Sequence, residues 1–250
     1  MYSISVMSNI TYVSCLISSK TDHIEITKRL SWLNAILELD INLILFVDST
    51  YKKHIPILRE TMRLIEIDFQ SLETVKLIQA VPSAQLPASR NTGKDTLEFM
   101  TIMNAKPEFL KLAKPYVETP YVAYLDAGIK KVFKLDNTLK RLETLRVHSV
   151  PLVMLPGCHP IQPQLFSKLA SQIDWTFCGG FFIVPTTAVE EFMQIHLKTL
   201  GVFLGENKIT WEVNVWTALA PAHRERIVWF PADHNDTMIT EIPKMCLLTK

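Results

Sequence analysis

The sequence predicts an α/β fold in which helices flank a mostly parallel central sheet. Three strand–helix repeats follow one another in about 70 residues, which is the pattern of a doubly wound sheet. Residues 41–47 (INLILFV) form a nearly continuous apolar run, as expected of a parallel strand covered on both faces. With 250 residues, 48% of them hydrophobic, and no internal repeat or linker, we expect a single domain over residues 1–250.

The elements follow from local periodicity in chain order. Strands have short apolar or β-branched runs, and we expect them at 11–18, 41–47, 64–69, 121–125, 150–155, 181–184 and 227–230. Helices have apolar residues at helical spacing, and we expect them at 24–39, 51–62 (interrupted near Pro56), 72–78, 95–105, 106–114, 188–200 and 211–219. A long loop is expected at 81–93, and turns at Gly157, Gly201 and Gly205.

Charge and hydropathy exclude several classes of protein. The net charge is +1, so no field of one sign would draw nucleic acid to the surface, and we expect no nucleic-acid partner. The apolar runs are far shorter than the roughly 20 residues that cross a bilayer, which predicts no transmembrane segment. The first 19 residues carry no charge, but they lack the basic region of a signal peptide and are interpreted as a short tail and a first core strand.

Four cysteines lie far apart, with no C-x-x-C pair, so the spacing favours neither a zinc knuckle nor a disulfide scaffold. Reduced thiols and a cytoplasmic location are the expectation, with peripheral membrane association as a variant of it. The sequence also lacks G-x-G-x-x-G, G-x-x-x-x-G-K-[ST], G-x-S-x-G and H-E-x-x-H, which argues against dinucleotide dehydrogenases, P-loop NTPases, α/β-hydrolases and zincin proteases.

The strongest local signal for a site is YVAYLDAGI, residues 121–129. A buried strand brings Asp126 to its carboxyl end, where open α/β sheets bind ligands, and Gly128 lets the backbone turn beside it. A carboxylate there can hold a divalent cation. A strand-ending Asp that caps the next turn explains the same residues.

Three further segments carry candidate residues. Gly179 and Gly180, in DWTFCGGFFIVP, permit close approach by another molecule, although a β-bulge would use the same pair. His234 follows the apolar run VWFP and could ligate the same metal as Asp126, although a surface turn also favours Asp-His-Asn-Asp. Glu212 and Asn214 lie on an otherwise apolar helix and point either into a cleft or to solvent.

Taken together and in this order, several segments resemble glycosyltransferases of the GT-A fold, and more narrowly the bacterial HtrL/YibB-like family. The segments that carry the resemblance are YVSCLIS, RLSWLNAILELDINLILFVD, MNAKPEFL, YVAYLDAGI, FCGGFFIVP and WFPADHND. The resemblance implies a nucleotide-binding half at about 11–125 and an acceptor-side half at 126–240. It implies transfer of a sugar from a nucleotide diphosphate sugar to a hydroxyl of a glycan, lipid-linked or protein acceptor.

The resemblance also implies roles for individual residues. Asp48 would contact the nucleoside, and Arg29 and Lys106 would stabilise the leaving diphosphate, with Asp126 and Gly128 in the donor site. Gly179, Gly180 and Asn214 would shape the acceptor side. Glu212 is the candidate general base, needed if the enzyme inverts the sugar configuration and dispensable if it retains it.

The metal follows less directly from the resemblance. The family has Asp-x-Asp where this chain has Asp126-Ala127-Gly128, so only Asp126 can supply a carboxylate. Either Mn²⁺ or Mg²⁺ is held by Asp126, His234 and the diphosphate oxygens, or Lys and Arg side chains replace the metal.

Two other functions fit the residues. One is a metal-dependent phosphohydrolase or nucleotidyltransferase built from Asp126, His159, Asp233 and His234. The other is a non-catalytic nucleotide-sugar-binding protein that kept the fold but lost the second Asp of the motif.

Overall fold

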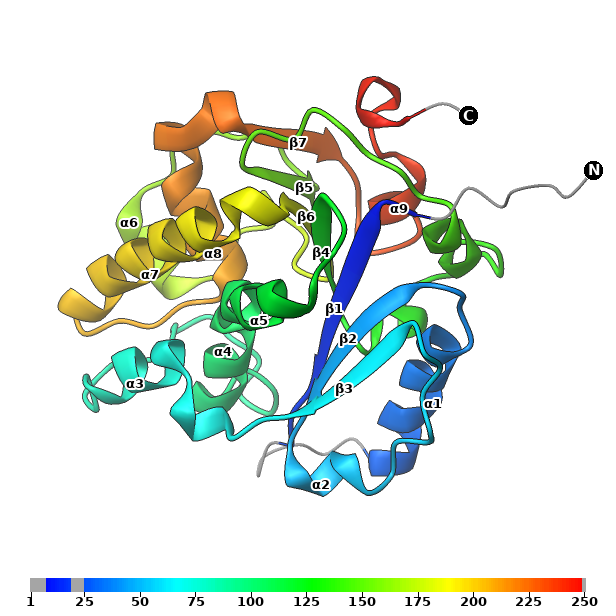
Figure 1. Cartoon of the computed structure of the whole chain (residues 1–250). Coiled ribbons are helices and arrows are strands. Elements are labelled where there is room, and N and C mark those ends of the chain that lie inside the picture. The colour runs from blue at the N-terminus through cyan, green and yellow to red at the C-terminus, as the bar shows by residue number, and fades with distance from the viewer. Residues whose placement is uncertain (1–7, 19–24, 249–250) are drawn as a thin grey trace, which may run out of the picture.

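A seven-stranded sheet organises the described part of the chain, residues 8–18 and 25–248 of the computed structural model (Figure 1). Its strand order is β3-β2-β1-β4-β6-β5-β7. The strands are β1 (Ile10–Leu16), β2 (Asn42–Val47), β3 (Met62–Glu66), β4 (Tyr121–Leu125), β5 (Val153–Gly157), β6 (Phe181–Pro185) and β7 (Ile227–Pro231). All pairings are parallel except the two made by β6. The predicted α/β class with a mostly parallel sheet is therefore confirmed.

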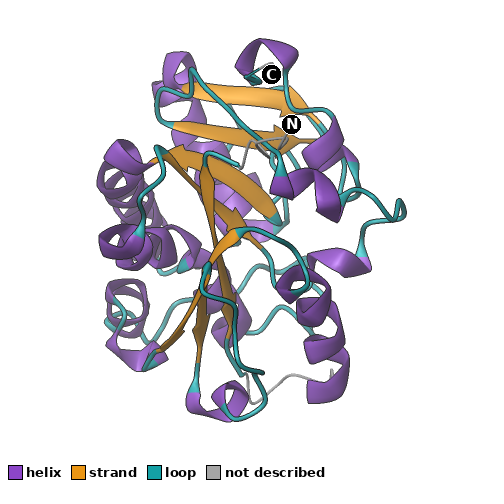
Figure 2. Ribbon diagram, turned by 45° about the vertical axis from the view of Figure 1, so that its right-hand side comes forward, coloured by secondary structure: helices purple, strands orange, loops and turns teal. Residues whose placement is uncertain are grey.

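Helices cover both faces of this sheet (Figures 1 and 2). One face carries α3 (Glu73–Gln79), α4 (Leu97–Asn104), α5 (Lys106–Ala113), α6 (Phe166–Ser171), α7 (Val189–Gly205) and α8 (Glu212–Leu219). The other carries α1 (Ile26–Leu37) and α9 (Thr237–Thr240), while the short α2 (Ser49–Lys52) follows β2. In the described residues, no helix combines the length and the apolar character needed to span a membrane.

Alternation along the strands produces the two cores. In β1, Val13 and Cys15 pack with Phe109 of α5, whereas Tyr12 packs on the opposite face with Ile36 of α1. All seven residues of β1 are buried, including the polar Thr11 and Ser14, as expected of a strand covered on both faces.

The sequence prediction was wrong at three places. The turn expected at Gly157 is instead the end of β5, where Gly157 pairs with Pro231 of β7. The helix expected at 51–62 is only the single turn of α2, because Pro56 lacks an N–H group and disfavours helical backbone at the residue before it. The turns expected at Gly201 and Gly205 are helical instead. Both belong to α7, and an added Cβ at either would meet no atom within 4 Å, so these glycines serve no close approach.

The reversed direction of β6 positions the candidate site. Because β6 runs antiparallel to β4 and β5, its amino end lies at the same sheet edge as their carboxyl ends. Leu125 pairs with Phe181, and the backbone N–H of Asp126 donates to the carbonyl of Gly180 at 2.9 Å. Two segments about 50 residues apart in sequence thus meet at one edge.

Asp236 fastens the loop after β7 to the segment after β4. Its carboxylate accepts hydrogen bonds from the N–H groups of Lys134 (2.9 Å) and Leu135 (3.1 Å) and from the hydroxyl of Thr138. Burial alone would raise the pKa of Asp236, but these three donors favour the carboxylate and hold its pKa below the ordinary value.

We expect Asp236→Ala to lower the free energy of unfolding by about 2 to 3 kcal/mol at neutral pH, because three donors lose their common acceptor. Since the folded-state pKa is lowered, this stabilisation is complete above the ordinary aspartate pKa and is lost as pH falls through the lowered value. Urea unfolding across acidic pH measures both effects. The exposed Asp136→Ala is the control, and a wild-type advantage that persists unchanged at the most acidic pH would contradict the prediction.

Candidate functional site

A cavity of about 760 Å³ lies at the carboxyl edge of the sheet. Its walls come from the ends of β1 and β4, from α1, α4, α5 and α8, and from the segments 89–95, 173–180 and 234–238. This is the edge at which open α/β sheets bind ligands. The volume is that of a small-molecule site, for which about 300 to 1,000 Å³ is usual.

Eight of the ten residues selected from the sequence line this cavity. They come from six separate segments of the chain: Arg29, Lys106, Asp126, Gly128, Gly179, Gly180, Glu212 and His234. Asp48 and Asn214 are not among the lining residues.

Asp48 instead organises the turn after β2. It is the N-cap of α2, where its carboxylate accepts from the N–H of Tyr51 at 3.0 Å and from the backbone N–H and hydroxyl of Ser18. Its carboxylate therefore joins the ends of β1 and β2, and nucleoside recognition by Asp48 stays a prediction.

Asn214 is fully buried inside the protein. Its amide N–H₂ donates to the carbonyls of Leu169 (2.7 Å) and Gln172 (2.8 Å) and to the hydroxyl of Thr210, and its oxygen accepts from the N–H of Asp174. Every hydrogen-bonding group of the side chain is used within the protein. This geometry gives Asn214 a structural role and leaves no atom for an acceptor substrate.

Lys106 and Glu212 form a buried ion pair in the wall of the cavity. The Nζ of Lys106 lies 2.5 Å from Oε1 of Glu212, 2.9 Å from the carbonyl of Gly179 and 5.3 Å above the ring of Tyr124. Only 2% of Lys106 and 4% of Glu212 is exposed, so each charge depends on the other for neutralisation. Lys106, predicted to meet the diphosphate directly, is thus engaged with the predicted base.

Gly179 is required by this pair. A Cβ at residue 179 would collide with Oε1 of Glu212 and lie 3.1 Å from Nζ of Lys106. At Gly180 an added Cβ would make only ordinary contact with Met238, at 3.6 Å. Among the seven glycines, all of which are described, none has a positive φ. Close approach, not left-handed backbone, explains the glycine at 179.

Asp126 has a local role and a place in the cavity at once. Its Oδ1 accepts the N–H of Gly128 at 2.8 Å, so the carboxylate caps the turn that follows β4. The residue also lines the cavity. The two interpretations offered by the sequence are therefore compatible, and the turn holds the carboxylate at the cavity wall.

The cavity wall carries an excess of positive charge. Arg29, Arg90, Lys94, Lys106 and Lys131 line it, against three acids, Asp95, Asp126 and Glu212. Aromatic rings lie beside some of these cations: the Nζ of Lys131 is 5.5 Å from the ring centre of Trp32, and that of Lys94 is 4.8 Å from that of Phe99. Such a wall attracts an anion that also carries an aromatic group.

Cys15 also lines the cavity, but it is not activated as a nucleophile. Its Sγ lies 3.3 Å from the hydroxyl of Tyr124, and burial raises the pKa of the thiol to about 12. Because the thiolate is the nucleophilic form, Cys15 is inert at neutral pH.

His234 lies in a group of thiols that sequence spacing did not predict. Its Nδ1 is 3.8 Å from Sγ of Cys158 and 3.9 Å from Sγ of Cys178, and the two sulfurs are 3.8 Å apart. Burial lowers the pKa of His234, against the opposing effect of Asp233, and raises the pKa of both thiols. The sequence feature that could have indicated this group is the position of each cysteine at the end of a strand. Cys158 follows one predicted strand, and Cys178 precedes the Gly-Gly pair at the start of another.

These contacts do not fit an Mn²⁺ or Mg²⁺ ion shared by Asp126 and His234. Within residues 8–18 and 25–248, the one cluster of three or more metal-ligating side chains is Cys158, Cys178 and His234, and Asp126 is not part of it. Mn²⁺ and Mg²⁺ prefer oxygen ligands, whereas two sulfurs surround this imidazole. A cation at Asp126 alone stays a prediction.

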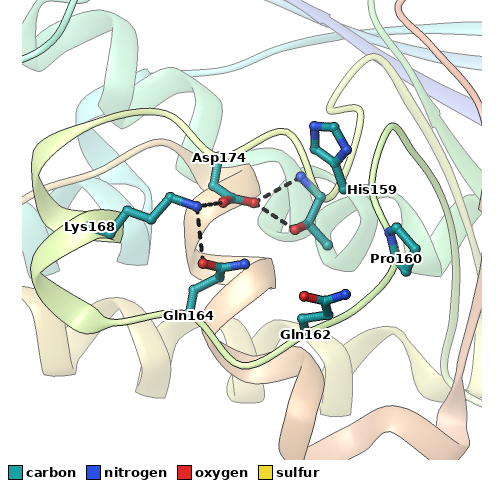
Figure 3. Close-up of a pocket in the computed structure, with 7 residues that line it drawn as sticks. His159, Pro160, Gln162, Gln164, Lys168 and Asp174 are labelled. Carbon is teal, nitrogen blue, oxygen red and sulfur yellow. Dashed lines mark hydrogen bonds and ion pairs between the residues drawn. The ribbon is translucent and has the colours of Figure 1, made fainter.

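A second, smaller pocket of about 280 Å³ contains His159 (Figure 3). Asp174 lies in its wall, bound to Nζ of Lys168 at 2.8 Å and to the N–H and hydroxyl of Thr176. His159 lines this pocket, whereas Asp126 and His234 line the larger cavity. The residues proposed for a phosphohydrolase are thus divided between two pockets.

We expect Gly179→Ala to lower the free energy of unfolding by about 1 to 3 kcal/mol, because the methyl group overpacks the Lys106–Glu212 pair. Gly180→Ala is the matched control and should change it by less than about 1 kcal/mol. Urea unfolding of the two variants gives the comparison, and equal stabilities would rule out the close approach at 179.

A buried and an exposed ion pair should differ in how much stability is lost when their lysine is replaced. Lys106→Met should cost about 3 to 5 kcal/mol, because it leaves a buried carboxylate without its partner. Lys52→Met, which removes the exposed pair with Glu66, should cost at most about 1 kcal/mol. In a double-mutant cycle, Lys106→Met and Glu212→Gln should be strongly non-additive, and additive losses would show that the pair is not coupled.

Comparisons with protein families and with curated proteins identified no relative of this chain. No protein-family model matches the chain, and no curated protein matches its sequence significantly. The functional argument therefore depends on the residues of the cavity and on the resemblance noted in the sequence.

Proposed function

We propose that the protein is a GT-A-like glycosyltransferase that moves a sugar from a nucleotide diphosphate sugar to a hydroxyl of a glycan, lipid-linked or protein acceptor. One observation supports this above all. Eight candidate residues from six separate segments of the chain line a single cavity at the edge where open α/β sheets bind ligands. A cytoplasmic location belongs to the same proposal.

The chemistry of the wall suits a nucleotide diphosphate. Lys131 brings positive charge beside Asp126 and Gly128, and Arg29 lines the same cavity. Preorganised cations stabilise the charge that develops on a departing diphosphate. Aromatic faces such as Trp32 and Phe99 offer stacking surfaces for a base. With these side chains in place, no metal ion is required for this step.

In the transfer, an acceptor oxygen forms a bond to the anomeric carbon while the bond from that carbon to the diphosphate oxygen breaks. The diphosphate leaves with the electron pair, and the acceptor proton passes to a base. We assign that base to Glu212, whose Oε1 is held by Lys106 and whose Oε2 is then the atom for the proton. Lys106 acts as a positioning residue, because it orients this carboxylate through a direct contact.

A non-catalytic nucleotide-sugar-binding protein is the second candidate. The observation in its favour is the same ion pair, since Glu212 is already engaged in a buried salt bridge with Lys106. Binding without turnover separates this candidate from the transferase.

We expect at least one donor in a panel of UDP-, GDP-, CMP- and dTDP-sugars to raise the melting temperature and to release nucleotide, with Mn²⁺ or with EDTA. Asp126→Asn preserves the shape of the capped turn but removes the carboxylate that would hold a cation, so it should reduce Mn²⁺-dependent release on the order of 100-fold and leave release in EDTA unchanged. Nucleotide release and thermal shift are the measurements.

The matched control is Asp136→Asn, which changes an exposed carboxylate that does not line the cavity and should leave the release unchanged. If donors bind but none turns over, with any acceptor offered, the binding protein replaces the transferase. If no donor changes the melting temperature or turns over, both proposals fail.

A further inference from the structure

Three potential metal ligands converge beside the cavity, and a fourth lies next to two of them. The three are the Sγ atoms of Cys158 and Cys178 and Nδ1 of His234, and the fourth is a carboxylate oxygen of Asp233. Oδ1 of Asp233 lies 3.7 Å from Sγ of Cys158 and 3.5 Å from Nδ1 of His234. The two sulfurs and Nδ1 of His234 lie 3.8 to 3.9 Å from one another and form one compact set of three. Asp233 is close to Cys158 and His234 but is not part of that set.

Three chain segments bring these atoms together. Cys158 follows β5, Cys178 precedes β6, and Asp233 and His234 follow β7. Backbone hydrogen bonds set the spacing: the N–H of Cys178 donates to the carbonyl of Pro156 at 2.8 Å, and that of Ala232 to the carbonyl of Gly157 at 2.9 Å. Gly157 is essential to this approach, because a Cβ there would collide with the carbonyl of Thr176.

These separations match a tetrahedral metal. With Zn–S bonds of about 2.3 Å and Zn–N or Zn–O bonds of about 2.0 to 2.2 Å, the tetrahedral edges are about 3.8 Å between sulfurs, about 3.6 Å from sulfur to nitrogen or oxygen, and about 3.4 Å from nitrogen to oxygen. Every given separation lies within about 0.3 Å of its edge. We propose that Cys158, Cys178 and His234 bind one Zn²⁺ ion, and that the exposed side chain of Asp233 turns to supply the fourth ligand.

The donor atoms select the class of metal. Two thiolates and an imidazole favour Zn²⁺ over Mg²⁺ or Mn²⁺, which prefer oxygen. On binding, each thiol loses one proton to solvent, and the two thiolates and the Asp233 carboxylate coordinate the ion with the neutral imidazole. No electron is transferred in this step. Four protein ligands close the coordination sphere, which is the arrangement of a structural site.

Zinc here would fix one wall of the cavity. The ring of His234 packs edge-on against Trp175, with centroids 4.3 Å apart, and both residues line the cavity. If Nδ1 binds zinc, the proton of the imidazole resides on Nε2, a buried atom that has no hydrogen-bond partner among the described residues. The ion thus joins the loop after β7 to the ends of β5 and β6 and presents this N–H group.

The experiment measures metal in the intact chain, purified under reducing conditions and titrated with Zn²⁺ and with Co²⁺. We expect one zinc per chain, a higher melting temperature with zinc than after chelation, and a cobalt spectrum with thiolate charge-transfer bands and intense tetrahedral d–d bands. Cys178→Ser should lose the stoichiometric zinc and both spectral features. His234→Gln is the second variant, at a less buried position, and should weaken or abolish the tetrahedral spectrum.

Cys246→Ser is the matched control, since it removes a buried thiol that lies outside the cluster, and it should keep one zinc. A reduced wild-type chain that binds neither zinc nor cobalt would overturn the proposal. A Cys158–Cys178 disulfide that persists under reducing conditions and excludes metal would overturn it as well. None of these readouts depends on sugar transfer, so the zinc proposal and the transferase proposal can fail separately.

Discussion

The buried ion pair of Lys106 and Glu212 is the interaction on which the site depends. It connects the first residue of α5 to the first residue of α8, and its lysine also holds the carbonyl of Gly179 ahead of β6. The starts of α5 and α8 and the segment before β6 are thereby held together around the ammonium group of Lys106. Glu212 gains further stabilisation from its position at the start of a helix, where the macrodipole favours a carboxylate. The pair is satisfied only while all three segments keep their places.

The same pair limits the chemistry that the cavity can perform. A lysine that neutralises a buried carboxylate cannot approach a diphosphate without leaving that carboxylate uncompensated. Recognition of an anion therefore falls to the more exposed cations, such as Lys131, and Lys106 acts through Glu212. Catalysis by proton transfer requires the carboxylate to take a proton while its partner stays charged, which burial makes costly unless a bound acceptor supplies new hydrogen bonds. This coupling gives the substrate a direct influence on the base.

Sequence patterns predicted the fold class and most strands, because the spacing of apolar residues along a short segment shows which of its residues will be buried. The end of a strand pointed to Asp126, scarce glycines to the Gly-Gly pair, and a polar position on an apolar helix to Glu212. Lys106 came only from the resemblance to GT-A glycosyltransferases. Sequence patterns could not show that Lys106 contacts Glu212, since 106 residues separate the two in sequence. They missed Cys158 and Cys178 for a related reason. Metal spacing rules describe ligands on one or two local segments, whereas the antiparallel β6 brings these thiols together from separate strands.

At the sheet edge, one residue can both stabilise a turn and line the cavity. The carboxylate of Asp126 caps the turn after β4 and lines the cavity, and the turn is what restrains its position. Asn214 marks the opposite case, because its buried hydrogen bonds leave no atom for a ligand. The physical distinction is the number of hydrogen-bonding atoms that remain after the backbone has been satisfied. A carboxylate with two oxygens can serve a turn and a substrate together, whereas an amide whose atoms are all used within the protein serves the fold alone.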